Sequence, residues 1–412
     1  MSTPTVHRDH QGEASNVPSM TDGSRVALLT GGIDRPYVTG LAVALASQNV
    51  CVDVLGSDEI DGLEMRATPM INFVNLYGSR AEANLFSKVA RVLRYYRRLL
   101  RYTATTESQI FHILWNNKFE FFDRTLLMLY YKLLGKKIVF TAHNVNAGKR
   151  DANDSWLNRV TLRAQYHLAD HIFVHTELMK KQLIEEFQIR EEFASVIPFG
   201  INNSVPDTAL TSAEARRKLG IEDGEKAILF FGALRPYKGL EYLVEGFLQL
   251  AAKDPLYRLI IAGQPRKEAE EYLTKILQRI ETDPNRGNVI LKLEFIPDDE
   301  TELYFKAADV LALPYTHVFQ SGVLFLAYGF GLPVVACEVG SVKDEVLEGK
   351  TGFLCRPRDP LSLANALETY FASDLSKDLT RQRKHIQARA SARNSWGVVS
   401  ERTRKVYAGL LK

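Results

Sequence analysis

From Arg25 onward, short apolar runs alternate with longer segments in which apolar residues recur every three or four positions. Short runs rich in Val, Ile and Phe predict strands, whereas a spacing such as that of Leu240, Leu243 and Phe247 predicts a helix. The predicted strands cover residues 25–30, 50–56, 110–115, 137–143, 171–176 and 195–198, then 227–233, 258–263, 289–295, 309–315 and 333–337. Continuous apolar strands that alternate with helices indicate parallel sheets covered on both faces.

A polar stretch over residues 202–214 separates the two series of predicted strands. Each series predicts a Rossmann-like domain, so we expect an α/β fold in which two such domains face each other across a cleft. The first domain should cover residues 25–201 and the second residues 202–393. Residues 1–24 are polar and lack the apolar core of a signal peptide, so we expect a disordered tail there.

Composition narrows the partners and the compartment. The 52 basic and 49 acidic residues nearly balance, so the total charge gives no support for a nucleic-acid partner, and none is expected. Three cysteines without a CxxC pair, in apolar surroundings, favour a reducing compartment, so we expect a cytoplasmic protein. The longest apolar stretch, residues 321–337, contains three glycines and a proline and does not predict a membrane span.

A predicted helix over residues 85–101 is strongly two-sided. On a helical wheel one side carries Leu85, Phe86, Val89, Val92, Leu93, Tyr96, Leu99 and Leu100, and the other carries Lys88, Arg91, Arg94, Arg97, Arg98 and Arg101. One interpretation is a core helix with a solvated basic face. The other places Arg94, Arg97, Arg98 and Arg101 on an anionic acceptor or on an anionic membrane surface, as a peripheral contact.

Two cations follow a predicted strand of the second domain. The strand ends at Gly232, the loop carries Arg235 and Lys238, and a helix begins near Gly239. A helix N-terminus offers free N–H groups and partial positive charge, and an added Arg and Lys would complete a diphosphate site. Two solvated loop cations are the alternative.

A second strand–loop–helix unit has the same character. Gln320 precedes Ser321, a good N-cap, while Gly322 allows close approach to the backbone, and Val323 follows in the helix. Two helix N-termini of one domain would then converge on one anionic group. By itself the segment is also an ordinary turn between strand and helix.

In the first domain, Gly31 and Gly32 directly follow the first strand, where a loop can approach a ligand closely. The loop is not a GxGxxG, so a dinucleotide cofactor is not supported. His143 ends another strand at the same edge and is either a functional or a structural histidine. The sequence has no metal-ligand spacing and no DxD in a suitable loop, so we expect no metal and no other cofactor.

These segments together resemble the retaining family 4 glycosyltransferases, which have the GT-B fold. The resemblance covers most of the chain and rests on GG at 31–32, HN at 143–144, VIPFGIN at 196–202, FGALRPYKG at 231–239, AADVLALPY at 307–315 and GLPVVACEVGSVKDEVLEGKTGFL at 331–354. It implies that the first domain binds the acceptor and the second binds a nucleotide-sugar donor. It also implies that residues 394–412 form a crossover helix that packs on the first domain.

The resemblance assigns roles to individual residues. Gly31 and Gly32 would face the donor phosphate, and His143 would contact the transferred sugar or its departing oxygen. Arg235 and Lys238 would neutralise the diphosphate leaving group. The remaining donor contacts would be Gly232, Gln320, Ser321, Gly322 and Val323. The expected reaction is transfer to a glycan, lipid-linked or small-molecule acceptor, with retention of anomeric configuration.

The sequence departs from the family pattern at two points. Val318 and Leu326 stand where the family often has two glutamates eight positions apart, and His317 becomes a candidate sugar contact. Ala233 stands where an arginine is more usual, so Arg235 would replace that arginine. Two alternatives follow: a nucleotide-sugar 2-epimerase of the same fold, or a degenerate protein that binds a sugar nucleotide or glycan without turnover.

Overall fold

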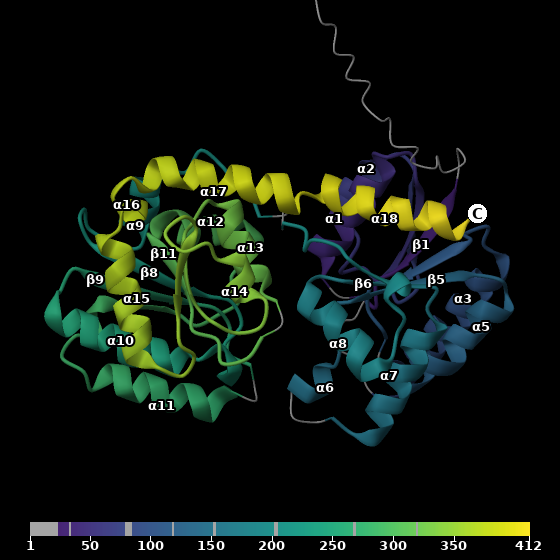
Figure 1. The fold of residues 1–412 in the computed structure, drawn as a ribbon, viewed down its shortest axis with the longest axis horizontal. Helices are drawn as coiled ribbons and strands as arrows, with labels where there is room; N and C mark the ends of the chain where they lie inside the picture. The colour runs from purple at the N-terminus through teal and green to yellow at the C-terminus, as the bar shows by residue number, and fades with distance from the viewer. Residues whose placement is uncertain are drawn as a thin grey trace, which may run out of the picture.

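The computed structural model describes residues 24–412, apart from residues 33, 79–84, 118, 151–153, 202–204, 267–268 and 319. The tail predicted over residues 1–24 therefore lies, except for Ser24, outside the described residues. Each predicted series of strands forms one parallel sheet, and the two sheets occupy the two halves of the molecule (Figure 1). The predicted two-domain α/β architecture of the GT-B type is confirmed.

The first sheet has seven strands in the order β3-β2-β1-β4-β5-β6-β7 and the second has six in the order β10-β9-β8-β11-β12-β13. The strands of the first sheet are β1 (Arg25–Leu29), β2 (Cys51–Gly56), β3 (Ile71–Asn75), β4 (Ile110–Ile113), β5 (Lys137–Ala142), β6 (His171–Val174) and β7 (Ala194–Val196). Those of the second are β8 (Lys226–Phe231), β9 (Tyr257–Ala262), β10 (Val289–Lys292), β11 (Val310–Leu313), β12 (Val334–Cys337) and β13 (Gly352–Cys355). The strand order reverses beside β1 and beside β8, and ligands bind at the carboxyl ends of strands at such switch points.

Helices cover both faces of each sheet (Figure 1). Those of the first half are α1 (Arg35–Ala46), α2 (Leu63–Ala67), α3 (Leu85–Thr105), α4 (Glu120–Phe122), α5 (Met128–Leu133), α6 (Ala147–Arg150), α7 (Trp156–Leu168) and α8 (Glu177–Phe187). The second half has α9 (Ser212–Lys218), α10 (Leu240–Lys253), α11 (Glu270–Glu281), α12 (Asp298–Ala307), α13 (Gly322–Gly329), α14 (Val342–Glu345), α15 (Pro360–Ala372), α16 (Asp374–Lys377) and α17 (Leu379–Asn394). The last helix is α18 (Trp396–Leu410).

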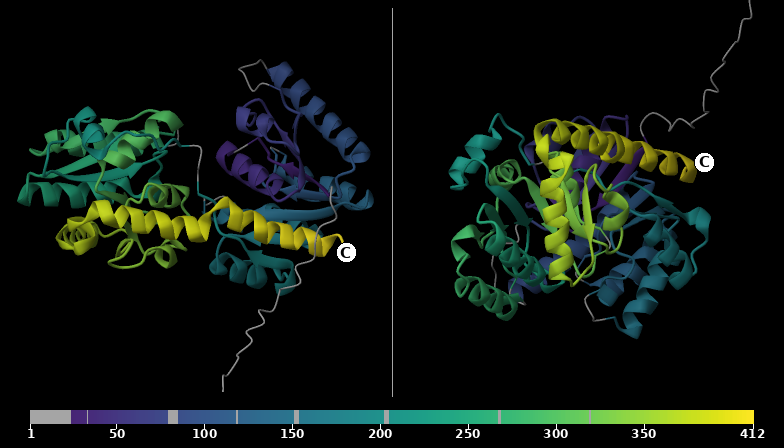
Figure 2. Two further views of the ribbon diagram at one scale, coloured as in Figure 1. Left: turned by 90° about the horizontal axis from the view of Figure 1, so that it is seen from above. Right: turned by 60° about the vertical axis from the view of Figure 1, so that its left-hand side comes forward.

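Helix α18 crosses back from the second half and packs against the first sheet (Figures 1 and 2). Its first residue, Trp396, donates its indole N–H to the carbonyl oxygen of Ile201 at 2.8 Å. A Cβ on Gly40 or on Gly200 would lie only 2.1 or 2.5 Å from that ring, so both glycines leave room for it. The exact domain boundaries predicted at 201/202 and 393/394 stay predictions.

A buried polar chain holds the other end of α18. The Tyr407 hydroxyl lies 2.6 Å from Nδ1 of His112 on the central strand β4, and His112 Nε2 lies 2.7 Å from the Thr141 hydroxyl. All three side chains are buried. Buried polar groups are stable only when they are paired, so this chain fixes where α18 lies on the sheet.

Helix α3 departs from its predicted wheel. Its buried side is formed by Tyr95, Leu99 and Thr103, whereas Val89 and Leu93, predicted on the apolar side, are 52% and 67% exposed. Figure 2 shows the N-terminal part of the helix extending beyond the other described helices of this half, and Val89 and Leu93 lie at the surface there. The predicted separation into one apolar and one basic face is therefore wrong for the outer part of the helix.

Candidate active site in the interdomain cavity

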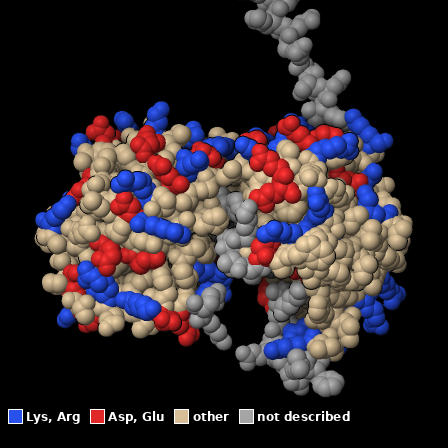
Figure 3. All heavy atoms as spheres, turned by 60° about the horizontal axis from the view of Figure 1, so that its bottom comes forward, with Lys and Arg blue, Asp and Glu red and all other residues tan. Residues whose placement is uncertain are grey.

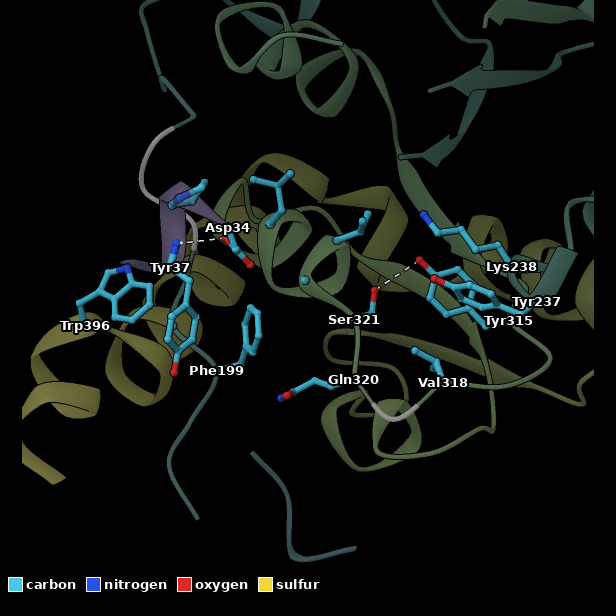
Figure 4. Close-up of a pocket in the computed structure, with 15 residues that line it drawn as sticks. Asp34, Tyr37, Phe199, Tyr237, Lys238, Tyr315, Val318, Gln320, Ser321 and Trp396 are labelled. Atoms are coloured by element: carbon cyan, nitrogen blue, oxygen red, sulfur yellow. Dashed lines mark hydrogen bonds between the residues drawn. The ribbon is translucent and has the colours of Figure 1, made fainter. Parts of the chain in front are cut away.

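A cavity of about 320 Å³ lies between the two halves, at the carboxyl ends of β1, β8 and β11. The first half and α18 contribute Asp34, Pro36, Tyr37, Phe199, Gly200 and Trp396, and the second half contributes Tyr237, Lys238, Tyr315, Val318, Gln320, Ser321, Gly322, Val323 and Leu326 (Figure 4). The space-filling view in Figure 3 shows the molecule hollowed between its two halves. Both halves of the molecule therefore contribute residues to one cavity.

Lys238 is a buried cation in the wall of this cavity. It ends the short 3-10 turn that leads into α10, and only 6% of the residue is exposed. Its Nζ lies 3.4 Å from the carbonyl oxygen of Phe231 and 5.8 Å from the ring centre of Tyr315. Burial, together with the charge of Arg235, lowers the pKa of this amine to about 8. Within the described residues no carboxylate forms an ion pair with it, so an anionic ligand would supply the missing charge.

The backbone around Lys238 depends on two glycines. Gly232 has φ of 97°, and a Cβ there would lie 2.9 Å from the Lys238 Nζ. Gly239 has φ of 66° and passes so close to Pro314 that a Cβ would lie 2.1 Å from its carbonyl oxygen. Residues with a side chain rarely adopt such backbone angles, so glycine is required at both positions. Gly232 is not among the described lining residues of the cavity, so its contact with the donor stays a prediction.

The N-terminus of α13 opens into the same cavity. Ser321 is the N-cap: its Oγ accepts from the backbone N–H of Leu324 at 3.4 Å and lies 3.3 Å from the Tyr315 hydroxyl. Gly322 and Val323, the first residues of the helix, line the cavity and keep their N–H groups at its free end. The helix dipole adds partial positive charge there. Lys238 and this helix end therefore face one cavity, and their shared contact with one anionic group stays a prediction.

Neighbouring residues divide into those that reach the cavity and those that do not. Gln320 lines it, and its Oε1 is buried without a hydrogen-bond partner among the described residues. Val318 and Leu326, at the two positions of the family's glutamates, form buried apolar walls. His317, proposed as a sugar contact, is exposed and is not among the lining residues described. Arg235 is also outside the lining and acts through its charge on Lys238.

The glycine loop after β1 has a supporting position. Gly31 and Gly32 have φ of 58° and 71° and are buried. A Cβ on Gly31 would lie 2.8 Å from the carbonyl oxygen of Asn116, so this glycine lets the loop pack against the residues after β4. The tight turn brings Asp34 and Tyr37, rather than the glycines themselves, into the cavity wall.

His143 lies behind that wall. Its ring stacks on Trp115, with centres 4.2 Å apart and planes 7° from parallel, and Tyr37 packs edge-on at 4.8 Å. Its Nδ1 lies 3.0 Å from Nε2 of His175, while its own Nε2 is buried without a partner among the described residues. Burial lowers the pKa of His143 well below its usual value, so the imidazole is neutral at physiological pH.

Sequence reasoning missed much of the lining, above all the aromatic residues Tyr37, Phe199, Tyr237 and Tyr315. Three of them, Phe199, Tyr237 and Tyr315, were visible only as members of longer motifs. Asp34 and Tyr37 carried a local signal, because an Asp followed by Pro two residues later marks a helix start immediately after a predicted strand. The Asp34 carboxylate does cap α1, accepting from the Tyr37 backbone N–H at 3.2 Å.

Two family models match consecutive parts of the chain. Residues 30–205 match the model described as Glycosyltransferase Family 4, and residues 225–373 match Glycosyl transferases group 1. The chain belongs to glycosyltransferase family 4. A D-inositol 3-phosphate glycosyltransferase of Corynebacterium diphtheriae is 30% identical to this family 4 chain over 284 residues. That match spans 66% of this chain and 64% of the relative, so it covers somewhat less than two thirds of the relative's length.

Solved structures show the same GT-B fold at low identity. Sucrose-phosphate synthase from Thermosynechococcus elongatus has a TM-score of 0.74 and 20% identity, over 94% of the family 4 chain and 99% of that chain. Anabaena HepE, solved in complex with UDP-glucose, has a TM-score of 0.70 and 18% identity. The match covers 94% of this chain and 99% of the HepE chain. At these identities the likeness extends to the fold alone.

No described helix is both long enough and apolar enough to span a membrane. Within the same residues, no three His, Cys, Asp or Glu side chains are grouped so that they could hold a metal ion.

Proposed function

We propose that this protein transfers a sugar from a nucleotide-sugar donor to a hydroxyl acceptor. The observation that carries the proposal is the buried Lys238 amine, which has no carboxylate partner among the described residues and faces the same cavity as the N-terminus of α13. A diphosphate fits this combination, because its charge would satisfy the amine and its oxygens would accept from the free N–H groups of the helix.

The same groups support catalysis. Negative charge develops on the diphosphate as the glycosidic bond breaks, and fixed positive groups stabilise that charge most where water is excluded. In the proposal Lys238 and the N–H groups of Gly322 and Val323 contact the phosphates, Ser321 holds the helix end in place, and Arg235 adds charge from behind. His143 and Gln320 supply acceptor atoms for the sugar. Retention of anomeric configuration is part of the proposal because the chain resembles the retaining family 4 enzymes. The reaction needs no metal ion in this proposal, because the protein itself neutralises the leaving group.

The relatives suggest substrates. HepE was solved with UDP-glucose, which supports a UDP-sugar as the first donor to test. The names of the inositol 3-phosphate glycosyltransferase and sucrose-phosphate synthase both point to phosphorylated small molecules, which supports a polyol or sugar phosphate acceptor beside glycan and lipid-linked ones. Leu326 lines the cavity where the family often has a carboxylate, so the ribose is bound without that group.

A second part of the proposal is a peripheral contact with anionic membranes through the outer face of α3. Arg94, Arg97, Arg98 and Arg101 are exposed there, and the exposed Val89 and Leu93 lie on the same helix. Figure 3 shows basic side chains bordering a wide uncharged area on this half of the molecule. Cations beside exposed apolar residues are suited to a surface where lipid headgroups meet acyl chains.

The test is a thermal-shift screen of the purified protein against UDP-, GDP-, ADP- and TDP-sugars, followed by mass spectrometry of reactions with sugar phosphate acceptors. A bound donor raises the melting temperature by mass action. We expect one nucleotide series to stabilise the protein and its sugar to appear on an acceptor, with and without EDTA. A donor that binds but is neither hydrolysed nor transferred would instead favour the degenerate binding protein.

The membrane contact needs its own measurement. Co-sedimentation with vesicles containing anionic lipid should be lost when Arg94, Arg97, Arg98 and Arg101 are replaced by glutamine, while donor turnover in solution is unchanged. Equal sedimentation of the variant would reject the contact. The 2-epimerase alternative has less support, because proton abstraction requires a carboxylate and the one carboxylate among the described lining residues, Asp34, caps α1.

A further inference from the structure

Two histidines that end neighbouring strands form a directional hydrogen-bonded chain behind the cavity. His143 follows β5 and His175 follows β6, and parallel strands bring these ends together at one edge of the sheet. His175 Nδ1 lies 3.3 Å from the carbonyl oxygen of Ile197, and His175 Nε2 lies 3.0 Å from His143 Nδ1. The hydrogen bonds thus connect the backbone carbonyl of Ile197 to the imidazole of His175 and then to that of His143.

The carbonyl fixes the direction of every proton in this chain. A carbonyl oxygen only accepts, so His175 Nδ1 must carry a hydrogen and donate it to Ile197. Both rings are neutral at pH 7, because burial lowers the pKa of His175 to about 4 and lowers the pKa of His143 well below its usual value. A neutral imidazole has one N–H, so His175 Nε2 accepts, and His143 Nδ1 must donate to it. His143 Nε2 is therefore a lone-pair acceptor.

This acceptor is buried and has no partner in the part of the chain that the structure describes. Nearly all buried polar atoms in proteins are paired, so an unpaired one requires an explanation. The ring is held rigidly by stacking on Trp115 and by the edge of Tyr37, and Tyr37 and Phe199, which both pack against it, also line the cavity. His143 Nε2 is therefore held in place beside a ligand cavity without a donor among the described residues. A hydroxyl of the ligand could donate to it.

We propose that His175 is a positioning residue that fixes His143 in its Nδ1–H form, so that His143 Nε2 accepts a hydrogen bond from a hydroxyl of the bound sugar. This inference rests on the proposed function for the identity of the ligand, a nucleotide sugar. It adds a rule of selectivity. A fixed lone pair attracts a hydroxyl and repels a carboxylate, so the sugar presents a hydroxyl rather than an anionic group at this position.

The tautomers are measured by NMR of protein with 15N-labelled histidine, which needs no activity. We expect both His143 and His175 to carry hydrogen on Nδ1, although free histidine favours hydrogen on Nε2. UDP-glucose should shift the His143 Nε2 resonance and UDP alone should not, because UDP lacks the sugar hydroxyl. A His143 that carries hydrogen on Nε2 in the free protein, or equal shifts with both ligands, overturns the inference.

Two substitutions of His175 separate positioning from packing. His175→Gln keeps an acceptor for the His143 Nδ1–H, whereas His175→Phe keeps the ring but removes the acceptor. We expect kcat/KM with the nucleotide sugar to fall about tenfold or more in the phenylalanine variant and to be largely rescued by glutamine. A purely structural His175 would give the reverse order, since phenylalanine better preserves the packing, and equal activities would also reject the role.

These results distinguish the inference from the proposed function. If the wild-type protein turns over no nucleotide sugar, the proposed transferase activity fails, whereas the NMR tautomers and ligand shifts still test the histidine chain. If turnover occurs but the tautomer is the opposite one, the activity stands and the inference fails.

Discussion

The buried amine of Lys238 allows a test in which stability and activity should move in opposite directions. Its pKa falls from 10.5 to about 8 in the folded protein. Each pKa unit corresponds to about 1.4 kcal/mol, so the charged amine destabilises the folded state by about 3 kcal/mol relative to the unfolded chain. Lys238→Met removes the charge and keeps the length of the side chain. We expect the free protein to become about 1–3 kcal/mol more stable at pH 7.

The sign of the pH dependence sharpens this prediction. Below pH 8 the Lys238 amine is protonated in both the folded and the unfolded protein, so the full destabilisation of about 3 kcal/mol is present. As the pH rises from about 8 to about 10.5, the folded state loses the proton first and the penalty disappears. Urea unfolding should therefore show a stability gap between variant and wild type that narrows from pH 7 to pH 10. The exposed Lys275 on α11 provides the control, because Lys275→Met should change stability by less than about 0.5 kcal/mol at either pH.

Activity of the same variant tests the phosphate contact. Loss of one fixed positive group at a developing charge typically costs about 100-fold or more in rate, so kcat/KM for the nucleotide sugar should fall by that factor. UDP should also stabilise Lys238→Met less than it stabilises the wild type. A variant that is less stable at pH 7 would refute the desolvation argument, and a variant with unchanged kinetics would refute the role in the site.

Three further predictions concern groups around the site and the crossover helix. Gly232→Ala should weaken UDP binding measured by calorimetry. The alanine Cβ would lie 2.9 Å from the Lys238 Nζ, and the φ of 97° at this position disfavours alanine. An affinity equal to that of the wild type would contradict the steric argument. Tyr407→Phe leaves His112 Nδ1 without its partner and should lower the free energy of unfolding in urea by about 1–3 kcal/mol, whereas no change would mean that the buried chain is unimportant. Because burial lowers the pKa of His112 to about 3, unfolding experiments should show stability falling as the pH drops from about 6.5 towards 3, and a flat profile over that range would contradict it.

The parallel sheets could be predicted from sequence because their strands are short continuous apolar runs. Two strands were not predicted, β3 and β13, and both lie at the edge of a sheet. β3 has the sequence Ile-Asn-Phe-Val-Asn with no fully buried side chain, and β13 is only the four residues Gly-Phe-Leu-Cys, so neither gave a clear apolar run. Predicted strands also ran past their true ends, as at residues 289–295, where β10 ends at Lys292. The apolar residues Leu293 and Phe295 continue the run into the loop, although Phe295 is 68% exposed, and periodicity does not distinguish such a loop from a strand.

The site was predictable as far as local chemistry reveals it. A cation two residues after a proline and before a helix start identified Lys238, and the N-cap identified Ser321. The pairing of His143 with His175 could not be read from sequence, because it depends on which strands become neighbours. Misplacement of Val89 and Leu93 has the same origin: a helical wheel gives the relative directions of side chains but not the number of faces that the fold covers.

Trp396 and Tyr407 also have a consequence for the order in which the protein is built. They belong to the hydrophobic core around β1 and β4, yet they leave the ribosome after the whole second sheet. During synthesis the first half must therefore wait with an incomplete core, its Trp396 site at Gly40 and Gly200 empty and His112 without its tyrosine. Expressed by itself, a fragment of residues 24–201 should aggregate, and co-expression of residues 379–412 should rescue its solubility.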